Sequence, residues 1–165
     1  MIDDLNKLIE SLREELKQYG ELLARLDHQQ EVILAMASDD IIATVSAVND
    51  QSAIVAQARK HRENCRINFA RKIGKPDKTT FEELIPLMPE EYRPLVKALV
   101  EENNKLIIQV QQRARQNHLL LKRSLELMQQ FINSLIKPET TTVYNGAGTL
   151  KSEEIKNKPL YEAIG

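Results

Sequence analysis

A repeating spacing of apolar residues near the start of the chain constrains its fold more than any other feature. Alternating steps of three and four residues place one set of side chains on a single side of an α-helix. All but two members of this set are apolar: Leu5, Leu8, Leu12, Glu15, Tyr19, Leu22, Leu26, Gln29, Ile33 and Met36. Leu16 and Leu23 widen the stripe, which indicates that more than one neighbour covers the helix. We therefore expect a helix from Ile2 to about Ala37.

A second helix of similar length is expected to follow. Ser38, Asp39 and Asp40 indicate an N-cap followed by acids in the first turn, where free amides and the helix dipole favour negative groups. Gly74 and Pro76 end the segment. Its apolar stripe is interrupted by a polar middle, and consists of Ile41, Val45, Val48, Val55, Phe69 and Ile73. This helix should therefore be less completely buried than the first.

Opposite charges indicate how these two helices pack. The residues up to Asp40 include ten acids and four bases, whereas Arg59–Lys75 holds seven Lys or Arg and one acid, Glu63. An antiparallel hairpin would bring these charges together, although each exposed pair contributes only about 0.2–1 kcal/mol. The whole chain has a formal net charge of -1 at pH 7. Pairing within the molecule therefore explains the basic segment, and we expect no nucleic-acid partner.

A short connector and one very long helix complete the helical part. Thr80 and Glu83 form a capping box, and prolines interrupt the brief helix that follows. The last helix should run from Glu90 to Ile136, roughly 47 residues or about 70 Å. Its seam comprises Tyr92, Leu95, Leu99, Asn103, Leu106, Val110, Arg113, Asn117, Leu120, Ser124, Leu127, Phe131 and Leu135. A polar member such as Asn117 either fixes the helix register or marks where the seam faces water or a partner.

These segments predict an all-α fold, an elongated antiparallel helical bundle or coiled coil with three main helices. Two should have about 35 residues and one about 47, joined by a short connecting helix. Pro138 stops the last helix, and no sustained period follows it. We therefore expect a helical-bundle domain over residues 1–137 and a flexible, mobile C-terminal tail over 138–165.

The residues that usually carry catalysis or bind metals do not converge in this sequence. His28, His61 and His118 lie far apart, and none follows a glutamate at the spacing of a di-iron or zinc site. Cys65 is interpreted as a half-buried helix residue and not as a nucleophile. We expect no enzyme activity, no metal and no cofactor. A single cysteine, no signal peptide and no membrane-spanning run favour a cytoplasmic protein without membrane insertion.

Late in the chain, an asparagine precedes a run of leucines, and a proline, a tyrosine and two glycines follow. These residues are Asn117, Leu120, Leu121, Pro138, Tyr144, Gly146 and Gly148. Their order resembles the flagellar type III export chaperones of the FlgN family, which carry such residues at the end of their last long helix and in the tail. The order of long helices and tail is also similar over nearly the whole chain.

The resemblance implies a carrier for other flagellar proteins, called clients below. It implies that the protein binds the C-terminal helical segments of hook–filament junction proteins, keeps them soluble and delivers them to the flagellar secretion apparatus. The client-binding residues would be Asn117, Leu120, Leu121, Leu127, Met128, Phe131 and Leu135. Tyr144, with Gly146 and Gly148, would dock on the cytoplasmic part of the export gate.

Each of these assignments has an alternative. The stripe on the last helix could instead pack internally against the first two helices, and Tyr144 could be an ordinary tail residue. The whole protein could also be a self-associating coiled-coil scaffold that needs no client, and a homodimer fits both functions. The apolar stripe would be the same for a scaffold, so only the tail distinguishes the two functions at the level of sequence.

Overall fold

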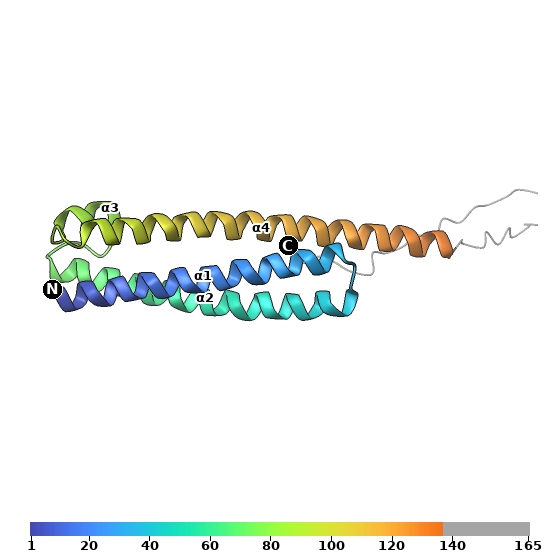
Figure 1. Cartoon of the computed structure of the whole chain (residues 1–165), viewed down its shortest axis with the longest axis horizontal. Coiled ribbons are helices and arrows are strands. Elements are labelled where there is room, and N and C mark those ends of the chain that lie inside the picture. Colours follow the sequence, from blue (N-terminus) through green and yellow to red (C-terminus); the bar gives the residue numbers. More distant parts are fainter. Residues whose placement is uncertain (137–165) are drawn as a thin grey trace, which may run out of the picture. The chain divides into compact units, whose positions relative to one another are not determined.

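A computed structural model of the chain describes residues 1–136, which form helices joined by turns (Figure 1). The elements are α1 (Ile2–Leu34), α2 (Ser38–Lys72), the short α3 (Phe81–Leu84), the 3-10 turn η1 (Ile85–Leu87) and α4 (Arg93–Leu135). The all-α prediction, with three main helices and a short connecting helix, is confirmed. The predicted tail, 138–165, lies outside the described residues, so the domain division stays a prediction.

The chain divides into one compact unit, Met1–Leu127, and a second unit that begins at Met128. Within the first unit, α1 and α2 form an antiparallel hairpin, and α4 runs beside it in the same direction as α1 (Figure 1). Asn103 Nδ2 donates to the Leu12 carbonyl at 3.1 Å, and Asn117 Nδ2 donates to the Leu26 carbonyl at 2.8 Å. Both pairs are 91 positions apart. The two helices therefore keep one register over two heptads.

Two apolar clusters hold the three long helices of this unit together. The predicted stripe of α1 supplies both, since all of its positions up to Ile33 are buried. The first cluster, which also includes the connector, consists of Leu5, Leu8, Ile9, Leu12, Phe69, Ala70, Leu84, Met88, Val96 and Leu99. The second consists of Tyr19, Leu22, Leu26, Val55 and Val110. On α2, Val55 and Phe69 are buried but Val45 is exposed, which confirms that α2 is covered less completely than α1.

The turn between α1 and α2 is a Schellman motif. The Met36 amide donates to the Ile33 carbonyl at 3.1 Å, and the Ala37 amide donates to the Val32 carbonyl at 3.5 Å. Met36 has a φ of 55°, in the left-handed region that favours glycine. This turn makes Ala37 the residue before α2, so the prediction of Ser38 as N-cap was wrong. Ser38 is the first helical residue, and its hydroxyl makes no capping bond.

The basic end of α2 pairs with acids on two sides. Arg62 Nε donates to the Glu15 carboxylate of α1 at 2.8 Å, and Glu15 is buried. Arg66 donates to the Asp77 carbonyl at 2.8 Å, and Arg71 donates to the Asp77 carboxylate at 2.6 and 2.7 Å. The bonds from Arg71 hold the pKa of Asp77 below its usual value. The basic segment therefore fixes the connector as well as the predicted hairpin.

The capping box at Thr80 forms as predicted. The Thr80 amide donates to the Glu83 carboxylate at 2.8 Å, and the Glu83 amide donates to the Thr80 hydroxyl at 3.4 Å. The beginning of α4 differs from the prediction, because Glu90 to Tyr92 form a turn and the helix starts at Arg93. Pro94 is the second residue of α4, in the first turn, where an amide has no partner within the helix and the missing N–H of proline costs no bond.

Candidate functional site

Asn117 is the last buried side chain of α4 among the described residues. Its Nδ2 bonds the Leu26 carbonyl, as above, and also the Gln29 Oε1 at 3.0 Å. Asn103 repeats the arrangement two heptads earlier, with bonds to the carbonyls of Leu12 and Leu99. Asn117 therefore occupies a register-fixing position in the core seam. A client could reach its side chain only if α1 moved away.

In both buried asparagines, Asn103 and Asn117, the side-chain Nδ2 group donates hydrogen bonds. Within the described part of the chain, the Oδ1 atoms of Asn103 and Asn117 have no hydrogen-bond partner. A buried acceptor without a partner lowers stability. The side-chain amides of Asn103 and Asn117 thus fix the register between α1 and α4, and they lower the stability in doing so. Single polar residues have the same effect in coiled-coil seams.

Replacing Asn103 by leucine is expected to raise the free energy of unfolding by about 1 kcal/mol, because the unpaired Oδ1 is removed and the carbonyls of Leu12 and Leu99 keep their bonds within their own helices. The measurement is urea unfolding followed by circular dichroism. Asn104→Leu is the matched control, since Asn104 is exposed and its replacement should change stability little. A clear loss of stability in Asn103→Leu would show that the hydrogen bond to α1 outweighs the unpaired oxygen.

Beyond Asn117, the apolar side chains of α4 are no longer buried. In the first unit, Leu120 and Leu121 are half-buried, and the exposed leucines are Leu119, Leu125 and Leu127. In the second unit, the exposed apolar side chains are Met128, Phe131, Ile132, Leu135 and Ile136. Polar residues at the intervening positions of the helix are Lys122, Arg123, Glu126, Gln129, Gln130 and Asn133. This end of α4 is therefore amphipathic, with its apolar side uncovered.

The positions that follow Asn117 at the spacing of the core seam are apolar, except for Ser124. Leu121, Ser124, Met128, Phe131 and Leu135 follow Asn117 in steps of three and four residues, as Leu99, Asn103, Leu106 and Val110 precede it. Of the predicted client-binding set, Asn117 is buried, Leu120 and Leu121 are half-buried, and Leu127, Met128, Phe131 and Leu135 are exposed. The predicted docking residues Tyr144, Gly146 and Gly148 lie outside the described residues.

Two exposed residues at the end of α1 were not assigned to a surface by the sequence. Met36 was predicted to belong to the core stripe, and this was wrong, because α1 ends at Leu34 and the Met36 side chain is 63% exposed. Leu34 is 66% exposed. The sequence signal that could have located them is the serine and two acids at Ser38–Asp40, which mark the start of a new helix just after this point.

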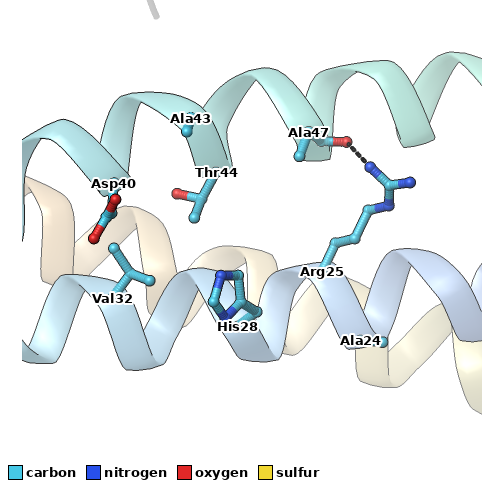
Figure 2. A pocket seen from close by; sticks show the side chains of 8 residues that line it. All are labelled: Ala24, Arg25, His28, Val32, Asp40, Ala43, Thr44 and Ala47. Atoms are coloured by element: carbon cyan, nitrogen blue, oxygen red, sulfur yellow. Dashed lines mark hydrogen bonds between the residues drawn. The ribbon is translucent and has the colours of Figure 1, made fainter.

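A shallow groove of about 590 Å³ lies between the end of α1 and the start of α2 (Figure 2). Small side chains on α2, Ala43 and Ala47, let the two helices approach each other, and Arg25 of α1 donates to the Ala47 carbonyl at 3.2 Å. His28 lies 3.9 Å from Glu31, and both side chains are exposed. These contacts are those of a solvated helix–helix surface.

Residues 1–136 contain no group of three or more side chains suited to hold a metal ion. Over the same residues, none of the helices combines the length and the apolar character that crossing a bilayer requires.

A protein-family model described as FlgN protein matches residues 1–152, which is nearly the whole chain. The chain belongs to the FlgN family. Membership of the FlgN family gives it the general role of a flagellar export chaperone. The match spans the α1–α2 hairpin, all of α4 and the position of Tyr144. No curated protein and no solved structure matches the chain.

Proposed function

We propose that the protein binds the C-terminal helical segments of hook–filament junction proteins and delivers them to the flagellar type III secretion apparatus. One observation carries this proposal: α4 keeps the spacing of its core seam after Asn117, while the side chains at that spacing become exposed. Membership of the FlgN family supports the general chaperone role. The protein acts as a cytoplasmic carrier, without catalytic turnover.

The uncovered side of α4 suits an amphipathic helix. A client helix that laid its apolar side on Met128, Phe131 and Leu135 would use the same kind of packing that holds α1 and α4 together. Burial of one such side chain contributes about 1.5–3 kcal/mol. Several of them offset the cost of association and leave micromolar affinity, roughly 8 kcal/mol. The same contact hides the apolar side of the client from aggregation.

Calorimetric titration with the C-terminal segment of a hook–filament junction protein from the same organism tests the proposal. Saturable binding at micromolar concentration or below is expected. The control is the same segment with serines in place of its apolar helix positions, which should not bind. If the folded protein fails to bind the native segment, and light scattering shows a tight dimer that the segment does not change, the protein is a self-associating scaffold instead.

The proposal extends to the tail, where Tyr144, Gly146 and Gly148 would dock on the cytoplasmic part of the export gate. Tyr144→Ala is expected to leave client affinity unchanged and to lower client export several-fold, because a buried aromatic side chain often dominates a small interface. Titration measures the affinity, and immunoblots of culture supernatant measure export. Tyr161→Ala, another tail tyrosine, is the matched control. A loss of client affinity in Tyr144→Ala would contradict a separate docking role.

A further inference from the structure

The packed contact between α1 and α4, called the α1–α4 seam below, stops where α1 ends. On one edge of this seam, Arg113 Nε lies 2.9 Å from the Asp27 carboxylate. One heptad later, the corresponding residues are Leu34 on α1 and Leu120 on α4. Another heptad later comes Leu127, and α1 has no residue left to cover it. All of these residues belong to the unit Met1–Leu127.

Two contacts between α1 and α4 place Leu34 at a level between Leu120 and Leu125. The ion pair of Asp27 with Arg113 places Leu34 level with Leu120, and the hydrogen bond of Asn117 to the Leu26 carbonyl places it level with Leu125. Leu34 therefore stands beside the stretch where the apolar side of α4 becomes exposed. Its own side chain is largely exposed as well, so both helices present apolar groups to solvent at this level.

Met36 adds a second apolar group at the end of α1. Its side chain is exposed, and its backbone has the left-handed conformation that glycine adopts without strain. The Schellman motif accounts for this backbone conformation. The exposure of the Met36 side chain is what makes it available to a partner.

Basic residues border the apolar side of α4 at this level. Lys122 stands one helical turn before Leu125, and Arg123 stands one turn before Leu127. Both basic side chains are exposed, and Arg123 lies 3.5 Å from Glu126. Residues that border a helical seam pair with opposite charges on the partner helix. A helix that covers this part of α4 should therefore carry acids where it faces Lys122 and Arg123, but not where it faces the exposed Glu31, one turn before Leu34 on α1.

We propose that the part of the client-binding surface of α4 that ends at Leu127 continues onto the end of α1 at Leu34 and Met36, and that its ligand is an amphipathic helix in line with α1, with acids facing Lys122 and Arg123. This inference rests on the proposed function. Continuity of the α1–α4 seam identifies the ligand as a helix, because an α-helix already fills the preceding part of the same seam. The basic side chains of Lys122 and Arg123 favour a ligand helix with acidic residues opposite them.

Leu34→Ser tests the contact with α1. Titration with the client segment is expected to show about 5- to 10-fold lower affinity, since an apolar contact at the edge of the surface is lost. Ile108→Ser is the matched control, because Ile108 is an exposed apolar residue of α4 that lies away from this stretch. The control should remain within about twofold of the original chain. Circular dichroism confirms that both variants keep their helices.

The double variant Lys122→Gln with Arg123→Gln tests the charge of the ligand. At low ionic strength it is expected to bind the client segment several-fold more weakly, and the difference should shrink at high salt. Lys105→Gln with Arg115→Gln removes the same charge from other exposed positions of α4 and serves as the control. Equal effects of the two double variants would contradict a ligand helix with acids facing Lys122 and Arg123.

Thiol protection gives a second measurement at the end of α1. In a Cys65→Ser chain, Leu34→Cys should react with an alkylating reagent more slowly when the client segment is bound. If the original chain binds the segment, but Leu34→Ser keeps full affinity and the thiol at position 34 is not protected, the extension onto α1 is wrong and the proposed function stands. If the original chain does not bind the segment at all, the proposed function itself fails.

Discussion

Phe69→Ala is expected to lower the free energy of unfolding by about 3–5 kcal/mol, the cost of removing a fully buried ring and leaving a cavity. The Phe69 side chain has 0% exposure and packs in the cluster that joins α1, α2, the connector and α4. Because α2 contributes few other buried apolar side chains, nothing nearby on that helix can replace the lost contacts. Urea unfolding followed by circular dichroism measures the loss.

Phe131→Ala provides the matched comparison for Phe69→Ala. The chemical change is the same, but Phe131 is 63% exposed near the end of α4. Its replacement should change the free energy of unfolding by less than about 0.5 kcal/mol. Equal losses in the two variants would mean that Phe131 is part of the folding core, which would remove it from the proposed client surface.

Phe131→Asp is expected to weaken client binding at least about tenfold, because it places a charge at the centre of an apolar contact. Helix content should fall little, since the side chain is exposed and lies near the helix end. Titration with the client segment measures the affinity, and circular dichroism measures the helix content. This change should exceed that of any variant at the edge of the surface.

Asn133→Asp is the control for Phe131→Asp, and it tests whether the effect depends on where the negative charge is placed. It introduces the same carboxylate two residues later, on the polar side of the same helix, and Asn133 is exposed. Client affinity should stay close to that of the original chain. Unchanged affinity in Phe131→Asp would remove this residue from the client contact. Complete unfolding of Phe131→Asp would instead assign Phe131 to the core.

The helices of the fold differ in how far the sequence could predict them. The stripe of α1 is almost uninterrupted from Leu5 to Ile33, and every position of it is buried. The stripe of α2 is broken by polar residues, and the structure buries Gln51 and Arg66 there because they bond the backbone of α1 and of the connector. Spacing alone cannot reveal such bonds, which depend on tertiary neighbours.

The candidate site could be predicted only as a region. The seam of α4 has one spacing throughout, so the sequence cannot separate Val110, which is buried, from Phe131, which is exposed. The difference arises where α1 ends, and the left-handed turn at Met36 sets that point. The resemblance to the FlgN family placed Asn117 in the same set as Phe131, and the sequence alone could not tell whether this polar residue is buried or faces a partner.

The register that Asn103 and Asn117 impose also restricts how a chain of this architecture can change in length. Their two acceptors on α1 are separated by the same two heptads as the asparagines themselves. An insertion between the two anchors in α4 alone would break at least one of the bonds. A length change must therefore add or remove whole heptads in α1 and α4 together. The length of α2 must change to match, because α2 connects the end of α1 to the connector before α4.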